Sequence, residues 1–449
     1  MVIVFVLVGL AVLAAFAALH RYAWCRLVRD TTRGPGPARR TGTAVIVAGP
    51  VLMFGALVAE RAGAPFWLQR TLGWPGFLWM ALSLYLLLAL VAGEFVRPLL
   101  RRFLERRAAA TEPAVRETSP APAGTPAGHE PGDEPRDAPG DEPADGPPAP
   151  LDAEPASPGA GRTPAGTLTS AAASEPSRRL FVSRVVGGGV AAAAVGTVGD
   201  GTYGVLRGPR VKRVTVPLAK LPRPAHGFRI AVVSDIHLGP VLGRGFAQRV
   251  VDTINATQPD LIAVVGDLVD GSVKDLGPAA APLAGLRARH GAYFVTGNHE
   301  YFSGAEQWVE EVRELGLHPL ENARTELPGF DLAGVNDVAG ESEGHGPDFG
   351  RALGDRDRAR ACVLLAHQPV VIDDAVRYGV DLQLSGHTHG GQLWPGEYVA
   401  ALANPTVAGL ERYGDTQLYV SRGAGAWGPP VRVGAPSDIT VVELASRQA

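Results

Sequence analysis

Residues 228–235 read FRIAVVSD, a run of apolar and β-branched residues that ends in a serine and an aspartate. The same form returns in LIAVVGD at 261–267, YFVTGNHE at 293–300 and ACVLLAHQP at 361–369. Short apolar runs of this kind are typical of strands that are buried on both faces of a sheet. Each run therefore predicts a central strand, and polar side chains follow each one.

Segments with helical spacing lie between these runs. RGFAQRVVDTINATQPD at 244–260 and SGAEQWVEEVRELG at 303–316 carry apolar residues three and four positions apart. Strands that alternate with helices predict a layered α/β sandwich over residues 211–449. Further runs complete the expected sheet at 331–337, 380–391, 417–425 and 438–444.

The polar residues at the strand ends share one kind of chemistry. Their side chains bind metal ions or move protons, and in α/β sheets such groups gather at the carboxyl ends of strands. One of them alone would be an ordinary polar strand end, but a series in chain order predicts a site. The series is Asp235, His237, Asp267, Asn298, His299, His367, His387 and His389.

The stretch LSGHTHGGQ at 384–392 holds the last two residues of this series. If the stretch is a strand, His387 and His389 point to the same side, because side chains alternate along a strand. An isolated His-x-His is more often a polar loop tip than a metal site, but here the other strand ends offer further ligands. The surrounding glycines leave room for a tight turn.

Together, SDIHLG, GDLVDG, GNHE, AHQP and GHTHGGQ resemble the motifs of the calcineurin-like metallophosphoesterase superfamily. Their spacing resembles the membrane-associated bacterial branch of that superfamily. The resemblance covers about residues 211–444 and does not extend to 1–176. It implies an α/β/β/α sandwich that hydrolyses phosphate esters with two divalent metal ions.

The resemblance also implies how the series divides between the metals. One carboxylate would bridge both ions, and each ion would take one histidine of the His-x-His pair. Mixed nitrogen and oxygen ligands without a thiolate suit Mn, Fe, Zn or Co. The first metal would be held by Asp235, His237 and His389, the second by Asn298, His367 and His387, and both by Asp267.

The expected reaction follows from two neighbouring metal ions. They lower the pKa of a bridging water and polarise the phosphoryl oxygens, so that the resulting hydroxide attacks phosphorus without a protein nucleophile. His299 lies next to the ligand Asn298 and would not bind metal. As an imidazolium, His299 would stabilise the transition state or protonate the leaving oxygen. The alternative for His299 is an orienting role.

Other residues are weaker candidates. We expect Asp270, in GDLVDG, to be a turn residue and His345 to lie in an exposed glycine-rich loop. Either Arg412 or Arg422 could contact phosphate. The segment GGQLWPGEYVAALANP at 390–405 could form an apolar wall of the cleft, which would suit a lipid-like substrate, or could simply be core.

Residues 1–107 are predicted to be a membrane region. Three apolar stretches, 1–19, 43–59 and 76–93, are of membrane-spanning length. Arginines are dense after the first and third stretches and sparse between the second and third. By the positive-inside rule, the N-terminus is outside and residue 107 is in the cytoplasm.

Two segments connect this region to the α/β domain. Residues 108–176 are rich in Pro, Ala, Gly and acidic residues, a composition that predicts a disordered linker. Residues 177–206 begin with a twin arginine, Arg178 and Arg179, before a Gly/Ala-rich apolar run. This pattern is typical of either a twin-arginine export signal or a fourth span. Both interpretations carry the α/β domain out of the cytoplasm.

Composition narrows the function further. The chain has 449 residues, a formal net charge of −3 and two cysteines, so we expect neither a nucleic-acid-binding surface nor a disulfide framework. The sequence predicts a multi-pass protein of the cell membrane with an extracytoplasmic phosphoesterase domain. Whether its substrate is lipid-linked stays open, as does its oligomeric state. The alternatives are a non-catalytic membrane scaffold that binds a ligand, and a nucleotide phosphodiesterase that faces the cytoplasm.

Overall fold

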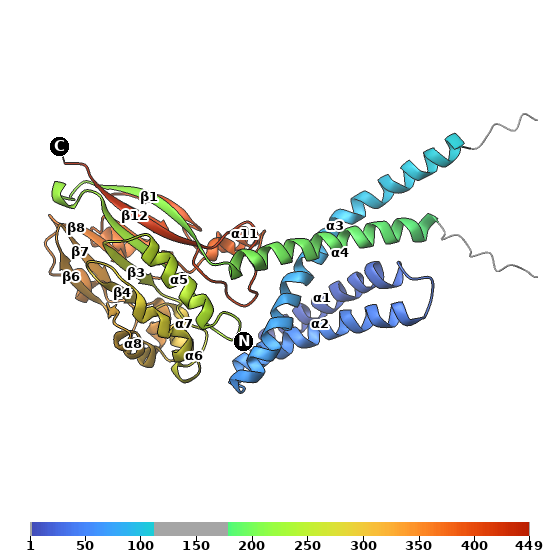
Figure 1. Cartoon of the computed structure of the whole chain (residues 1–449), viewed down its shortest axis with the longest axis horizontal. Coiled ribbons are helices and arrows are strands. Elements are labelled where there is room, and N and C mark those ends of the chain that lie inside the picture. Colours follow the sequence, from blue (N-terminus) through green and yellow to red (C-terminus); the bar gives the residue numbers. More distant parts are fainter. Residues whose placement is uncertain (1, 112–177, 449) are drawn as a thin grey trace, which may run out of the picture. The chain divides into compact units, whose positions relative to one another are not determined.

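The computed structural model describes residues 2–111 and 178–448 (Figure 1). Met1–Arg101 and Arg178–Ala449 form one compact unit. The predicted linker at 108–176 lies outside the described residues, except for residues 108–111, which continue a helix.

Two six-stranded sheets form the α/β part of the chain. In the first sheet β2, β3, β4 and β5 run parallel, and β12 is antiparallel to β2. In the second sheet β11, β9, β8 and β7 run parallel, with antiparallel strands at both edges. The first sheet has the order β1 (Arg210–Leu218), β12 (Asp438–Ser446), β2 (Phe228–Val233), β3 (Leu261–Val265), β4 (Ala292–Val295) and β5 (His318–Pro319). The second has the order β10 (Gly409–Tyr413), β11 (Thr416–Val420), β9 (Leu382–Ser385), β8 (Ala361–Leu365), β7 (Phe330–Gly334) and β6 (Ala323–Leu327).

The sheets pack face to face, and helices cover their outer faces. Alternate residues of β2 show this division: Ile230 and Val232 belong to the core between the sheets, whereas Ala231 and Val233 pack toward helices. The helices over the first sheet are α5 (Arg244–Ala256), α6 (Val273–Ala280) and α8 (Ala305–Glu314). Those over the second are α9 (Phe349–Leu353) and α10 (Ile372–Arg377). The predicted α/β/β/α sandwich is confirmed.

Short helical turns connect the strands. Cys362 on β8 is fully buried, as expected of a small apolar residue, and neither cysteine is in a disulfide. The turns are η2 (Arg223–Ala225), η3 (Ala281–Gly285), α7 (Asn298–Ser303), η4 (Val338–Glu343), η5 (Pro369–Val371), η6 (His389–Gly391) and α11 (Gly396–Ala400).

The strands are shorter than the sequence runs suggested, and this corrects two expectations. The predicted strand at 380–391 ends with β9 at Ser385, so the His-x-His pair lies in a turn and does not use strand alternation. The predicted strand at 293–300 ends at Val295, and Asn298 begins α7. At the end of each strand the chain leaves the sheet, and the polar side chains that follow turn toward one another.

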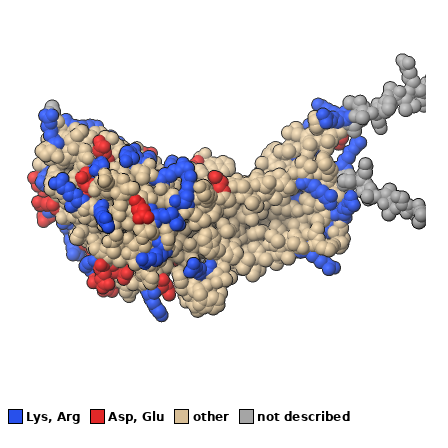
Figure 2. All heavy atoms as spheres, viewed as in Figure 1, with Lys and Arg blue, Asp and Glu red and all other residues tan. Residues whose placement is uncertain are grey.

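Four helices are long and apolar enough to cross a membrane by length and composition within the described residues. Glycines allow them to pack closely, as is common in membrane bundles: a Cβ on Gly49 would overlap the Trp79 ring, and a Cβ on Gly93 would lie 3.1 Å from Val186. Figure 2 shows a long face of this helical part without charged side chains, with basic side chains gathered at one end. The helices are α1 (Val2–Trp24), continued by the π-turn η1 (Cys25–Arg29), α2 (Pro37–Arg61), α3 (Phe66–Thr111) and α4 (Arg178–Leu206).

Candidate metal centre

All eight predicted site residues lie beyond the carboxyl ends of adjacent central strands. The first sheet contributes the ends of β2, β3 and β4, and the second contributes the ends of β8 and β9. The site therefore forms along one edge of both sheets, where side chains from five loops meet. Asp235 and His237 follow β2, Asp267 follows β3, Asn298 and His299 follow β4, His367 follows β8, and His387 and His389 follow β9.

The backbone at these residues is unusual. Five of the eight have a positive φ, a conformation that non-glycine residues rarely adopt and that costs of order 1 kcal/mol or more each. This conformation turns the chain sharply at the strand end, and the side chains then point into the site. The φ values are 51° for Asp235, 49° for His237, 52° for Asp267, 74° for His387 and 52° for His389. The sequence carried no sign of this strain.

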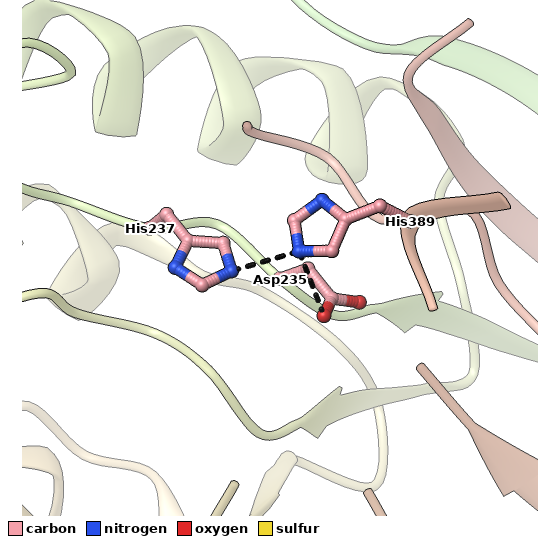
Figure 3. Close-up of side chains that lie close together, drawn as sticks. All are labelled: Asp235, His237 and His389. Carbon is pink, nitrogen blue, oxygen red and sulfur yellow. Dashed lines mark hydrogen bonds and ion pairs between the residues drawn. The ribbon is translucent and has the colours of Figure 1, made fainter. Parts of the chain in front are cut away.

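One group of candidate ligands consists of Asp235, His237 and His389 (Figure 3). The Nε2 atoms of His237 and His389 face each other at 3.0 Å, and His389 Nε2 lies 3.5 Å from Asp235 Oδ1. All three side chains are buried. Two ring nitrogens and a carboxylate oxygen thus converge on one point that is shielded from water, as the ligands of a metal ion do.

A second group contains Asp267, His367 and His387. His367 Nδ1 donates to the Val265 carbonyl oxygen at 2.9 Å, and this hydrogen bond orients the ring so that Nε2 faces Asp267. His367 Nε2 is buried, makes no hydrogen bond and lies 3.1 Å from Asp267 Oδ2. His387 Nδ1 is 3.0 Å from Asn298 Oδ1, which adds an amide oxygen to the group.

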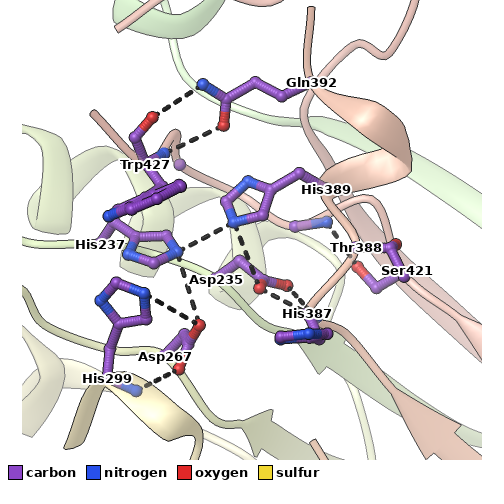
Figure 4. A network of polar contacts seen from close by, with 12 residues as sticks. Asp235, His237, Asp267, His299, His387, Thr388, His389, Gln392, Ser421 and Trp427 are labelled. Carbon is purple, nitrogen blue, oxygen red and sulfur yellow. Dashed lines mark hydrogen bonds and ion pairs between the residues drawn. The ribbon is translucent and has the colours of Figure 1, made fainter. Parts of the chain in front are cut away.

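Asp267 belongs to the second group and also approaches His237 of the first group and His299 (Figure 4). Its Oδ2 is 3.1 Å from His367 Nε2, 3.7 Å from His237 Nε2 and 4.0 Å from His299 Nε2. Its Oδ1 accepts a hydrogen bond from the backbone N–H of His299 at 2.9 Å. A Cβ on Gly297 would lie 2.2 Å from this Oδ1, so only glycine leaves space for the carboxylate.

The residues present fit divalent metal ions. His237 Nε2 and His389 Nε2 face each other at 3.0 Å, and His367 Nε2 faces Asp267 Oδ2 at 3.1 Å, so ligand-type atoms are brought together at both groups. The ligand atoms are nitrogen and carboxylate or amide oxygen, a set that suits transition metals. Within the described residues, three groups offer ligand atoms close together: the two above, and His237 with Asp270 and His299.

Asp270, which we expected to be a turn residue, contacts two histidines of the site. The carboxylate is nearly buried, and its Oδ1 accepts hydrogen bonds from His237 Nδ1 at 2.8 Å and from His299 Nδ1 at 2.7 Å. It therefore orients one candidate ligand and the candidate acid together. The available signal was a second aspartate three residues after Asp267 in GDLVDG.

The charge of each histidine depends on its surroundings. Burial acts to lower the pKa of His299, but the hydrogen bond and charge of Asp270 outweigh it and raise this pKa to about 9. Burial and the neighbouring His367 lower the pKa of His387 to about 4. Burial and His237 also hold the pKa of His389 well below its ordinary value. His299 is therefore cationic at neutral pH, whereas the His-x-His pair is neutral and able to bind metal.

The carboxylates respond to the same histidines. Burial acts to raise the pKa of Asp267, but His367, together with His237 and His299, lowers it far below the ordinary range. Burial likewise opposes ionisation of Asp270, and His237 and His299 again outweigh it and lower this pKa. Both groups remain anionic at neutral pH.

Two further buried residues hold the loops in place. Glu300 is fully buried and accepts three backbone hydrogen bonds, from Gly297 at 2.6 Å, Leu268 at 2.8 Å and Asp267 at 3.0 Å. Arg432 donates to the carbonyl oxygens of Gly425 at 2.7 Å and His389 at 3.0 Å. Neither role was visible in the sequence, because both depend on backbone groups of distant loops.

Among the weaker candidates only Asp270 lines the cavity beside this centre. Arg412, Arg422 and His345 are absent from its walls. The segment at 390–405 neither lines that cavity nor forms core, since Trp394 is 48% exposed and Tyr398 is 67% exposed. Both expectations for that segment were wrong.

Comparisons with known proteins agree with this geometry. Residues 228–391 match the family model for calcineurin-like phosphoesterase. A zebrafish transmembrane protein with metallophosphoesterase domain is 39% identical over 250 residues, which cover 53% of this chain and 57% of that protein. An uncharacterized metallophosphoesterase from Helicobacter pylori J99 is 36% identical over 272 residues, 60% of this chain and 73% of that protein.

Among solved structures, phosphopantetheinyl hydrolase from Mycobacterium tuberculosis aligns with a TM-score of 0.28 at 14% identity. That alignment covers 44% of this chain and 89% of the hydrolase. The family binds divalent metals, and this chain has candidate ligand clusters for them.

Proposed function

This chain belongs to the calcineurin-like metallophosphoesterase family, and on that premise we propose that it is a membrane-held, dinuclear metal-dependent phosphoesterase. The position of Asp267 carries the proposal. A single carboxylate oxygen lies within 4.0 Å of the Nε2 atoms of three histidines that belong to both sides of the site. A bridging carboxylate between two metal ions requires such a position.

The chain's residues divide between two metal ions. When bound, the ions would supply Lewis-acid charge at the phosphoryl oxygens and lower the pKa of a coordinated water. The first would be held by Asp235, His237 and His389, the second by Asn298, His367 and His387, and both by Asp267.

His299 acts on the leaving group. Asp270 holds its Nδ1, so that the Nε2–H lies on the side of Asp267 and of the cavity. As an imidazolium, His299 donates this proton to the leaving oxygen as the bond to phosphorus breaks. The ring centroids of Phe302 and Trp427 lie 5.5 Å and 5.7 Å from that of His299, and only 14% of the His299 side chain is exposed.

The basic end of the helices supports an extracytoplasmic catalytic domain. Arg26 pairs with Glu94, and Arg184 donates to the carbonyl of Thr31, so the arginine-rich ends of α1, α3 and α4 meet. The opposite end of α4 joins the catalytic domain, where Val205 is fully buried in the core beside the first sheet. By the positive-inside rule the arginine end is cytoplasmic and the catalytic domain is outside.

A metal-dependence experiment on the full chain in detergent tests the proposal. We expect hydrolysis of p-nitrophenyl phosphate or bis(p-nitrophenyl) phosphate that a chelator abolishes and added Mn²⁺ restores. Asp267→Asn should lower activity by roughly 100-fold or more and reduce the content of both metals, because even groups that only support ligands are worth roughly 10–100-fold.

Asp252→Asn, an exposed carboxylate on α5, is the matched control and should behave as wild type. Two full metals in an active Asp267→Asn protein would contradict the bridging role. A metal-loaded wild type without activity on either ester would favour the scaffold alternative instead.

A further inference from the structure

A cavity of about 1020 Å³ opens beside the candidate metal centre. Asp267 and His299 line one part of it. Another part is lined by apolar side chains of the membrane region: Leu57, near the end of α2, and Phe66, Phe77 and Met80 on α3. The wall of the site is therefore built in part by two helices that are long and apolar enough to span a bilayer.

The helical hairpin formed by α2 and α3 is in direct contact with the catalytic domain around this cavity. Phe66 packs against the core cluster on the helical side of the first sheet. Further along α3, the Tyr85 hydroxyl donates to the Trp394 carbonyl at 3.1 Å. Both parts belong to the same compact unit, so the cavity is a feature of one body.

The chemistry of the walls changes from one part of the cavity to the other. The metal centre supplies charged and ligand-type groups, which suit a phosphate. Phe302 and Trp427 form the next part of the wall, because both rings lie beside His299. The hairpin then adds the apolar Leu57, Phe66, Phe77 and Met80 and, beside them, the polar Glu60, Arg61 and Gln69. An alkyl chain placed along the apolar side chains gains by leaving water. A water-soluble phosphate ester would gain no binding energy from an apolar wall formed by membrane helices.

An exposed apolar surface on the catalytic domain also indicates contact with a membrane. Trp394, Tyr398, Val399 and Leu402 are between 48% and 87% exposed, in and around α11. Tyr85 on α3 contacts the start of this segment. Aromatic and aliphatic side chains exposed beside a membrane helix are typical of a surface that lies in the membrane interface.

We propose that the substrate is a membrane lipid that carries a phosphate ester. This inference rests on the proposed phosphoesterase function and names its substrate class. The phosphate reaches Asp267 and His299 while the lipid chain lies along Leu57, Phe66, Phe77 and Met80. The oxygen of a water molecule forms the new bond to phosphorus, and one proton of that water passes to solvent. The bond from phosphorus to the leaving oxygen breaks, and that oxygen takes a proton from His299.

Pairs of substrates that differ only in chain length test this inference. With the metal-loaded full chain in mixed micelles, kcat/KM is measured for hexadecyl and methyl p-nitrophenyl phosphodiesters, and for hexadecyl and butyl phosphate. We expect the long-chain member of the hydrolysed pair to be preferred by at least roughly tenfold, since several methylene groups leave water.

Substitutions at two neighbouring residues then test where the lipid chain lies. Leu57 is 37% exposed and lines the cavity, whereas Val58 is 63% exposed and does not. Leu57→Gln should lower the long-to-short ratio by roughly tenfold, because an amide replaces an apolar contact. Val58→Gln should leave the ratio within about twofold of wild type.

The outcomes separate this inference from the function on which it rests. Equal kcat/KM for long and short chains, with both esters hydrolysed, would overturn the lipid assignment and leave the phosphoesterase function standing. Equal effects of Leu57→Gln and Val58→Gln would also overturn it, because the chain would then lie elsewhere. Failure to hydrolyse any of the four esters would remove the phosphoesterase function and the lipid assignment together.

Discussion

Asp270 accepts a hydrogen bond from two histidines. Burial acts to lower the pKa of His299, but this hydrogen bond and the charge of Asp270, with smaller contributions from Asp267 and Glu300, raise it from an ordinary value of 6.5 to about 9. Asp270→Asn keeps an oxygen that can accept but removes the charge, so this pKa should fall. Between pH 6.5 and 9, His299 of the variant then loses its proton, whereas His299 of the wild type keeps it. We expect kcat at pH 8 to drop by about tenfold or more and to change little at pH 6.

A pH–rate profile measured under one metal condition checks this prediction. Metal content should stay near wild type, since the amide oxygen can still orient His237. Asp260→Asn, at a half-exposed carboxylate that pairs with Arg229, is the matched control. A basic limb that does not move in Asp270→Asn would show that His299 does not act as the acid.

The identities of the candidate ligands could be predicted from the sequence, but their local conformation could not. Each ligand follows an apolar run, and the ends of parallel strands meet at one edge, so the series Asp235 to His389 predicts a shared site. The positive φ of Asp267 and His387 has no signature, because aspartate and histidine rarely adopt it without tertiary support. Asp270 and Glu300 were missed because their partners lie in space and not along the chain.

At the scale of elements, α7 holds two loops of the site together. Its third residue, Glu300, accepts the backbone N–H groups of Gly297 before α7 and of Asp267 and Leu268 after β3. Glu300→Gln leaves only one accepting oxygen, so at least one buried N–H loses its partner. We expect a loss of about 1–3 kcal/mol in the free energy of unfolding, together with weaker metal binding.

Thermal unfolding of metal-free and metal-loaded protein measures both effects of Glu300→Gln. Glu306→Gln provides the control, because Glu306 is an exposed acid in the first turn of the neighbouring helix α8. If Glu300→Gln unfolds like Glu306→Gln and binds metal as wild type does, the three hydrogen bonds do not organise the site.

Most central strands could be predicted because they are buried on both faces and read as continuous apolar runs. Their ends could not, since the polar motifs continue the same sequence runs without a turn signal of their own. The edge strand β1 was also missed: RVKRVTVPL alternates charged and apolar residues and pairs on one side only, with β12. Edge strands lack the two-sided burial that makes central strands recognisable.

At the scale of the whole molecule, α4 links the membrane helices to the catalytic domain. Its middle packs against α3 at Gly93 and against Thr31 at Gly187, and its end contributes the buried Val205 to the domain core. The helix is rich in glycine and alanine, and its most apolar stretch is less apolar than those of α2 and α3. A twin-arginine route tolerates such weak apolarity and exports folded domains, which would allow the metals to bind before export.

We therefore predict that Arg178→Lys combined with Arg179→Lys leaves the catalytic domain in the cytoplasm while α1, α2 and α3 remain inserted. The substitutions conserve charge, so the positive-inside balance of the helix end is unchanged and only recognition of the arginine pair is lost. Arg184→Lys, also at the start of α4, is the matched control and should not affect export. Protease accessibility of the catalytic domain in intact spheroplasts is the measurement. A domain that remains equally accessible in the double variant would show that α4 inserts as an ordinary fourth span, and a wild-type domain that is itself protected would show that the active site faces the cytoplasm.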